Sequence, residues 1–388
     1  MNAPPLGVYV HWPFCARICP YCDFNVYRDR GVDADRWADA LTRDLAAWAA
    51  RTPKRPLASL YFGGGTPSLM PTSVLAAVVE TCARIWGFAD DAEIGLEANP
   101  TDAEADRFAA FAAAGVNRLS VGVQSLRDDA LAFLGRNHDA AGARRAIDAA
   151  MAAVGNVSFD LIYARPGQTA AAWRDELDEA LAIGAPHLSV YQLTVEDGTA
   201  FERAVARGAW APLDETREAD LYDLAQEATA AAGLPAYEVS NHARPGAASG
   251  HNLLYWRGGD YVGVGPGAHG RLTRDGARFA TVADRRPDAY LARVDETGVG
   301  GDAERLDRQA AFAERIMMGL RLVDGADIAG FEDERAAIAP AIAHLVEAGL
   351  LIDAAPRLRA THDGRRVLNA LTGYLLADAP SAEGSASG

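Results

Sequence analysis

Between residues 7 and 192, short β-rich segments alternate with helical patterns in a repeated order of strand, loop and helix. The segments with strand character are GVYVHW at 7, SLYF at 59, EIGLEA at 93, RLSVGV at 118, NVSFDLIY at 156 and HLSVYQL at 187. This order is typical of a parallel α/β sheet, because each crossover helix returns the chain to the same end of the sheet. The sequence therefore predicts an α/β fold with a partial (β/α)6 barrel, since a full barrel has eight strands.

Helical patterns fill the intervals between these strands. The first helix is expected over residues 33–50, and the second, around 73–86, repeats apolar residues on one face. Cys82 belongs to that apolar stripe and is predicted to be a core thiol. A third helix is expected to begin at Thr101, where the letters TDAE have the pattern of a capping box.

Changes in pattern divide the chain into predicted segments: residues 1–200 as the partial barrel, 201–300 as an extension rich in glycine and aromatic residues, 301–376 as a C-terminal α+β domain, and 377–388 as a disordered tail. The extension is expected to contain a helix at about 214–232. In the third segment we expect helices near 303–321 and 333–348, a hairpin formed by GLLIDA and RLRATH, and a last helix to Leu376. That order resembles a winged-helix domain.

Charge and hydropathy narrow the classes of partner. With 53 acidic and 37 basic residues the net charge is -16, which repels phosphate backbones, so we expect no nucleic-acid partner. No apolar run has the length of a membrane span. The N-terminus lacks the pattern of a secretory signal, and reduced thiols need a reducing compartment, so a cytoplasmic protein is predicted.

Three of the four cysteines, Cys15, Cys19 and Cys22, form a C-x3-C-x2-C pattern within eight residues. Three thiolates on one short loop can bind an iron–sulfur cluster and leave its fourth corner without a protein ligand. A disulfide framework fits less well, because it is typical of small secreted domains. A closed zinc site also fits less well, because it needs a fourth ligand and the nearest candidates, His11 and Cys82, form no suitable pair.

The cysteine pattern, with Tyr21 before its last cysteine, resembles the signature of radical S-adenosylmethionine (SAM) enzymes. In that superfamily the three cysteines hold a [4Fe-4S] cluster, and the amino and carboxylate groups of SAM occupy the fourth iron. The flanking letters YVHWPFC and CPYCDFN are similar to the family of the coproporphyrinogen III dehydrogenase HemN and the haem chaperone HemW.

Further motifs after the strands are consistent with a SAM site. A glycine loop, YFGGGTPS, follows the second strand, where the absence of Cβ atoms lets a ligand approach the backbone. Polar residues near later strand ends can accept hydrogen bonds from an ammonium or from ribose hydroxyls, although each alone is as readily a helix cap or a surface charge. The resemblance implies SAM contacts from Tyr9, Tyr21, Gly64, Gly65, Thr66, Glu97, Gln124, Arg136 and Asp160.

A last motif, HNLLYW, begins at His251. An imidazole can ligate haem iron, and aromatic side chains offer flat apolar surface to a macrocycle. The motif resembles the haem-binding sequence of the HemW branch, which implies haem as a third bound group with His251 as its ligand. His11 and His269 are the alternative ligands.

Two functions are compatible with the family. A dehydrogenase would use radical chemistry to decarboxylate coproporphyrinogen III to protoporphyrinogen IX, whereas a chaperone would hold haem as cargo and transfer it to an acceptor protein, for which the family implies a respiratory haem protein. The dehydrogenase branch resembles C-x3-C-x2-C-x-C, but Phe24 stands at the last position here, and only fourteen residues precede Cys15. The prediction is therefore a haem chaperone. Whether SAM is cleaved, on this or another substrate, and whether the chain forms a homodimer stay open at this point.

Overall fold

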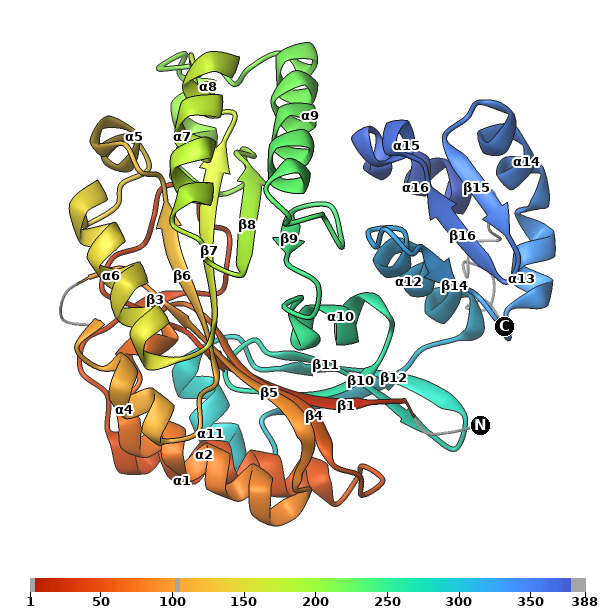
Figure 1. Cartoon of the computed structure of the whole chain (residues 1–388). Coiled ribbons are helices and arrows are strands. Elements are labelled where there is room, and N and C mark those ends of the chain that lie inside the picture. The colour runs from red at the N-terminus through yellow and green to blue at the C-terminus, as the bar shows by residue number, and fades with distance from the viewer. Residues whose placement is uncertain (1–3, 102–104, 378–388) are drawn as a thin grey trace.

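The computed structural model describes residues 4–101 and 105–377. Most of the predicted capping box and the tail from residue 378 onward therefore lie outside the described residues. At the centre of the molecule is an eleven-stranded sheet in the order β13-β12-β11-β10-β1-β4-β5-β6-β7-β8-β9 (Figure 1).

The middle of this sheet consists of the strands that the sequence predicts. They are β1 (Leu6–Trp12), β4 (Leu57–Gly64), β5 (Phe88–Ala98), β6 (Arg118–Gln124), β7 (Asn156–Tyr163) and β8 (His187–Gln192). These strands are consecutive neighbours and run parallel. The α/β prediction of a partial barrel is confirmed. Among the described residues the two edge strands, β13 and β9, do not pair with each other, so the sheet stays open.

The extension and the first residues after it, 301–305, add strands to both ends of this sheet, which the sequence analysis did not predict. They are β9 (Asn241–Ala243), β10 (Asp260–Val264), β11 (His269–Arg274), β12 (Ala277–Ala283) and β13 (Gly301–Arg305). β10 runs parallel to β1, whereas β11, β12 and β13 form an antiparallel meander beside it, and β9 pairs antiparallel with β8. β9, β10 and β13 have five residues or fewer, and β10, β11 and β13 contain glycine, so their local pattern is weak.

Helices cover the outer face of the sheet, and α10 lies on its inner side (Figure 1). The bounds are α1 (Ala34–Ala49), α2 (Thr72–Ile85), α4 (Phe108–Ala113), α5 (Asp128–Phe133), α6 (Ala140–Ala153), α7 (Ala170–Ala182), α8 (Ala200–Ala206), α9 (Glu215–Ala231), α10 (Gly250–Trp256) and α11 (Pro287–Thr297). Three short elements, β2 (Phe14–Cys15), β3 (Tyr27–Arg28) and the 3-10 turn η1 (Pro67–Leu69), surround the cysteine loop.

The predicted helices at 33–50, 73–86 and 214–232 are confirmed as α1, α2 and α9. Asp33 caps α1 by accepting from the Arg36 N–H at 3.1 Å. Cys82 is fully buried on α2 and packs in the main hydrophobic core, as predicted.

The C-terminal unit has its own hydrophobic core, which includes Phe312, Ile316 and Leu358. Its elements are α12 (Arg308–Gly319), β14 (Ala326–Asp327), α13 (Glu332–Ala337), α14 (Ala339–Glu347), β15 (Leu351–Ala354), β16 (Arg357–Ala360), α15 (His362–Arg366) and α16 (Leu368–Ala377). The predicted hairpin is confirmed as β15 and β16, which pair antiparallel.

Two helix predictions in this region were wrong in their bounds. Residues 301–305 form β13 because they pair with β12, and α12 begins only after Asp307, whose side chain accepts from the Ala310 N–H at 2.7 Å. The single helix expected at 333–348 is two helices, α13 and α14. The second has Pro340 in its first turn, where the missing N–H is tolerated, whereas in a continuous helix it would remove a hydrogen bond. The domain boundaries at 200 and 300 stay a prediction.

Within the residues described, no helix combines the length and the apolar character that a membrane crossing requires.

An ion pair between a half-buried arginine and a buried glutamate joins the C-terminal unit to the extension. Glu238 is fully buried and accepts from Arg321 Nη2 at 3.1 Å, from the Ser240 N–H at 2.7 Å and from Asn241 Nδ2 at 2.7 Å. The Arg321 guanidinium also lies over the Trp256 ring, with Cζ 4.6 Å from its centroid. This arginine therefore anchors the C-terminal unit beside α10.

Replacing Arg321 with methionine is expected to lower the free energy of unfolding by about 3 kcal/mol, because Glu238 keeps its charge in a buried site without a cation. The matched control is Arg174→Met, which removes an exposed pair with Asp178 and is expected to leave stability nearly unchanged, because solvent screens exposed ion pairs. Urea denaturation followed by circular dichroism measures both. Equal effects of the two substitutions would contradict the anchoring role.

Candidate functional site

The three neighbouring cysteines lie on a loop that follows β1 at the carboxyl end of the sheet. Cys15 ends β2 and is buried, whereas Cys19 and Cys22 are half-buried. The Cys22 N–H donates to the Cys19 carbonyl at 3.2 Å, and the Asp29 N–H donates to the Cys15 carbonyl at 2.9 Å. No disulfide involves any of the four cysteines. One short, hydrogen-bonded segment thus presents three thiols.

The electrostatics of this loop favour a cationic group beside it. Burial, with smaller contributions from the neighbouring Cys19 and Cys15, raises the pKa of Cys22 to about 11. Because the thiolate is the form that binds metal, a bound cationic centre would offset this unfavourable charge. In the described part of the chain, no group of His, Cys, Asp and Glu converges as the ligands of a single metal ion do. A cluster does not require such convergence, since each thiolate binds its own iron.

Arg136 is held against the cysteine loop by several hydrogen bonds. Its Nη1 donates to Cys19 Sγ at 3.1 Å and to Tyr21 Oη at 3.3 Å, and its Nη2 donates to Asn99 Oδ1 at 2.7 Å and to the Gly122 carbonyl at 2.8 Å. A guanidinium at hydrogen-bond distance from a cysteine sulfur stabilises its thiolate form. Arg136 and Tyr21, both predicted from the sequence, therefore lie beside the predicted cluster ligands.

The glycine loop packs directly onto the cysteine loop. The Gly65 N–H donates to the Trp12 carbonyl at 2.7 Å, and a Cβ at Gly65 would lie 3.0 Å from Cys15 Sγ. Gly64 has a φ of 111° and approaches the His11 ring so closely that a Cβ would lie 2.6 Å from it. Only glycine fits both constraints at position 64. Packing against the cysteine loop and His11 thus requires glycine in this loop, which is also a candidate ligand contact.

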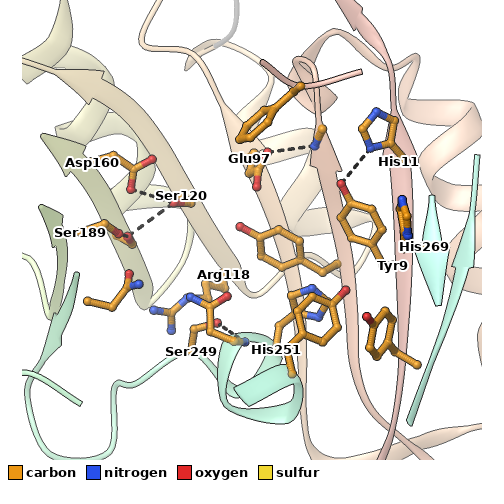
Figure 2. Close-up of a pocket in the computed structure, with 18 of the residues that line it drawn as sticks. Tyr9, His11, Glu97, Arg118, Ser120, Asp160, Ser189, Ser249, His251 and His269 are labelled. Carbon is orange, nitrogen blue, oxygen red and sulfur yellow. Dashed lines mark hydrogen bonds between the residues drawn. The ribbon is translucent and has the colours of Figure 1, made fainter. Parts of the chain in front are cut away.

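Two half-buried carboxyl groups, Glu97 on β5 and Asp160 on β7, face the same pocket (Figure 2). Burial, followed by the charge of Asp160, raises the pKa of Glu97 to about 7, although Glu97 accepts from the Gly64 N–H at 3.1 Å. Burial raises the pKa of Asp160 to about 6, and Ser120 donates to its Oδ1 at 3.4 Å. Both carboxyl groups therefore lose their protons near neutral pH, where the change in their charge would alter the binding of a cationic ligand.

The pocket has a volume of about 650 Å³ and lies on the inner side of the sheet. This volume lies in the range typical of small-molecule and cofactor sites. The structure brings some of the predicted residues together at its wall: Tyr9, Gly64, Glu97, Asp160 and His251. The other predicted contacts do not line it and lie instead around the cysteine loop or at strand ends: Tyr21, Gly65, Thr66, Gln124 and Arg136.

Gln124 and Thr66 have positions that a ligand site can explain. Gln124 ends β6 with a φ of 70°, a conformation that is uncommon for a residue with a side chain and that is often found at functional sites. Thr66 is buried beside the glycine loop, and its Oγ1 accepts from Asn99 Nδ2 at 3.1 Å.

His251 lies at the inner end of the pocket, on α10. Its ring is stacked on Tyr61 with centroids 4.3 Å apart and touches Tyr255 at the same centroid distance. Its Nδ1 lies 3.3 Å from Ser59 Oγ, and only 2% of the residue is exposed. Burial lowers its pKa to about 3, so the ring is neutral at physiological pH.

Sequence reasoning missed a set of polar residues that line the same pocket from three adjacent strands: Arg118 and Ser120 on β6, Ser158 on β7, and His187, Ser189 and Tyr191 on β8. They occupy alternate positions, as side chains on one face of a strand do. Polar residues at every second position of neighbouring strands were therefore a readable signal of a polar interior.

The fold and the site together define a radical SAM protein. The profile described as the Radical SAM superfamily matches residues 9–180, and the profile of the HemN C-terminal domain matches residues 306–367. The fold is similar to the solved structure of coproporphyrinogen III oxidase (HemN) from Escherichia coli, with a TM-score of 0.79, 22% identity and coverage of 96% of this chain and 90% of that one.

Relatives of known name show to which family of radical SAM proteins the chain is similar. Heme chaperone HemW of Escherichia coli is 36% identical over 97% of this chain and 100% of that protein. HemW of Mycobacterium tuberculosis is 38% identical over 97% of this chain and 96% of that protein. The mitochondrial radical S-adenosyl methionine domain-containing protein 1 of Danio rerio is 39% identical over 84% of this chain and 74% of that protein. The chain belongs to the HemW family, and as a radical SAM protein it uses a [4Fe-4S] cluster and SAM as cofactors.

Single substitution of Cys15, Cys19 or Cys22 by alanine is expected to remove the cluster, because a [4Fe-4S] cluster with two protein ligands is poorly held. Iron content and visible absorbance after anaerobic reconstitution measure the loss. Cys82→Ala is the matched control and should retain full iron content, since Cys82 lies in the core. Unchanged iron in the three loop variants would contradict the assignment.

SAM affinity is expected to rise about tenfold between pH 6 and pH 8, because Glu97 and Asp160 lose their protons in that range and an ionised carboxylate accepts hydrogen bonds more strongly. Equilibrium dialysis with labelled SAM measures the profile. Glu97→Gln should flatten it, whereas Glu80→Gln, at an exposed position on α2, should leave it as in the wild type. A profile of the same shape in the Glu97 variant would exclude the role of this carboxyl group.

Proposed function

We propose that this chain is a haem chaperone, which binds haem together with a [4Fe-4S] cluster and SAM and transfers the haem to an acceptor protein. The observation that carries this proposal is the similarity to proteins named Heme chaperone HemW over nearly the full length of both chains. The likeness to HemN, at 22% identity, concerns the fold alone.

In this proposal the cysteine loop holds the cluster through Cys15, Cys19 and Cys22. The fourth iron is left for the amino and carboxylate groups of SAM. The remaining predicted contacts surround SAM: Tyr9, Tyr21, Gly64, Gly65, Thr66, Glu97, Gln124, Arg136 and Asp160. Cys15, Cys19 and Cys22 would hold the cluster, which would supply one-electron chemistry at this site. Support comes from the close packing of the glycine and cysteine loops and from the half-buried Glu97 and Asp160 on the pocket wall.

Phe24, two positions after Cys22, supports a chaperone over a dehydrogenase. Phe24 stands where the dehydrogenase pattern has another cysteine. Its side chain is 64% exposed and lies at the pocket wall. An exposed aromatic ring beside a pocket offers a flat surface to a macrocycle and contributes no thiolate to the cluster. His251, at the inner end of the same pocket, is the haem-contacting residue that the sequence motif implies.

The remaining assignments follow from the family resemblance and from charge. We propose a haem-accepting protein, of the respiratory class, as partner, a cytoplasmic location and a homodimer as one accessible state. The acidic net charge supports the proposal that nucleic acid is not a partner.

A paired assay on one anaerobically reconstituted sample tests this function. One portion is titrated with haem and followed by absorbance, and a second is incubated with SAM, reductant and coproporphyrinogen III. The expected result is stoichiometric haem binding without formation of protoporphyrinogen IX. Decarboxylated product would make the chain a dehydrogenase, and HNLLYW would then be a structural motif.

A further inference from the structure

Arg118, the first residue of β6, is a buried cation on the wall of the pocket, beside Ser249 and His251 (Figure 2). Only 3% of the residue is exposed. Its Nη1 donates to Glu93 Oε2 at 3.3 Å and to the Ala247 carbonyl at 3.2 Å, whereas its Nη2 makes no hydrogen bond with any residue that the structure describes. Because a buried guanidinium nitrogen without an acceptor is costly, this nitrogen indicates that a ligand oxygen completes the site.

The carboxylate next to Arg118 is already occupied by other donors. Glu93 accepts from Ser249 Oγ and from the N–H groups of residues 250 and 251, each at 3.0 Å. Its bond with Arg118 is longer, at 3.3 Å. The three shorter bonds attach α10 to β5, and they leave the positive charge of Arg118 incompletely neutralised. The guanidinium can therefore bind a second carboxylate without releasing the first, since its fork offers several N–H donors.

The pocket wall around Arg118 is polar and can accommodate an anion. Strands β6, β7 and β8 and helix α10 contribute hydroxyl, imidazole and amide groups to it: Ser120, Ser158, His187, Ser189, Tyr191 and Asn252. The carboxyl groups among the described lining residues are Glu97 and Asp160, and burial raises the pKa of Glu97 to about 7 and that of Asp160 to about 6. Each of these carboxyl groups can take up a proton when a ligand carboxylate binds nearby, which removes the repulsion between like charges.

The part of the wall beside β11 and β12 has a different character. These strands lie on the other side of β1 from β6 in the sheet. Phe24 is 64% exposed and Val282, on β12, is 43% exposed, so this part offers apolar surface. Arg285 also lies there, and among the described residues no carboxylate pairs with it, but its side chain is exposed. Water therefore competes for the Arg285 guanidinium much more than for that of Arg118.

We infer that Arg118 binds a propionate of the haem cargo, so that the propionate edge of the macrocycle points toward β6 to β8 and an apolar edge points toward Phe24 and Val282. This inference rests on the proposed haem-chaperone function and keeps His251 on α10 as the haem contact. Haem carries its propionates on one edge and apolar substituents on the others, which matches the division of the pocket wall. Arg118 thereby makes the site selective for porphyrins that have a free carboxylate.

The test compares ferric haem with its dimethyl ester, in which the propionates carry no charge, by Soret titration of the full reconstituted chain. The wild type should bind haem at least about tenfold more tightly than the ester, because only haem offers a carboxylate to the guanidinium. Arg118→Gln should remove this preference by weakening the binding of haem and leaving that of the ester unchanged, whereas a folding defect would weaken both. Arg165→Gln is the matched control, since Arg165 is another buried arginine paired with a glutamate but does not line the pocket, and it should keep the preference.

Arg285→Gln decides between the two parts of the pocket wall, and its exposed position makes it tolerant of substitution. A preference for haem that survives in this variant supports the inference, also where Arg118→Gln does not fold. A preference that is lost in Arg285→Gln, or equal affinity of the wild type for haem and ester, would overturn the inference and leave the chaperone function intact. If the wild type binds neither haem nor ester, the proposed function and the inference both fail.

Discussion

The close approach of the glycine loop to the cysteine loop is the contact on which the site depends. Gly65 donates to the end of β1 and leaves no room for a Cβ beside Cys15 Sγ, and Gly64 makes the equivalent approach to His11. This contact fixes the cysteine loop over the carboxyl ends of β1 and β4. The Gly64 N–H also donates to Glu97 on β5, so the glycine loop is linked to that strand as well. One backbone turn therefore links the candidate cluster ligands to the candidate SAM contacts.

The pocket combines two chemical environments. Toward the cysteine loop and the strand ends it presents carboxyl groups and backbone, which suit the ammonium and ribose of SAM. At the inner end, α10 covers it with His251 and Tyr255. Glu93 fixes α10 there by accepting from Ser249 Oγ and from the N–H groups of residues 250 and 251, each at 3.0 Å. A neutral, stacked imidazole in this setting lies at the pocket floor, whereas the wall beside β11 combines the exposed apolar side chains of Phe24 and Val282 with the guanidinium of Arg285.

Much of the fold could be predicted from the sequence, because the central strands and helices have strong local patterns. The β-rich segments between helical patterns predicted β1 and β4 to β8. The apolar stripe of α2 predicted the burial of Cys82. The strands β9 to β13 were not predicted, because they are stabilised by pairing with β1, β8 and one another rather than by a strong pattern of their own. The break between α13 and α14 was readable from Pro340 but was missed.

The candidate site could be predicted where a motif marks it. The cysteine loop, the glycine loop and Glu97 lie together as expected from strand ends that meet at one edge of a parallel sheet. The interior residues Arg118 and Ser189 carry no motif, and only the assembled sheet shows that their strands face one pocket. The nearly complete burial of His251, which the sequence analysis predicts as the haem ligand, is likewise a property of tertiary packing that the motif alone does not show.

The central claim is that three cysteines hold a cluster whose fourth iron binds SAM, and electron–nuclear double resonance tests it most directly. The reduced, reconstituted chain is measured with SAM that carries a nitrogen-15 label in its amino group. The account predicts a hyperfine coupling between the cluster and the labelled nitrogen, which disappears when SAM is omitted. Bound SAM without that coupling, or coupling to an imidazole nitrogen of the protein in its place, would contradict the account.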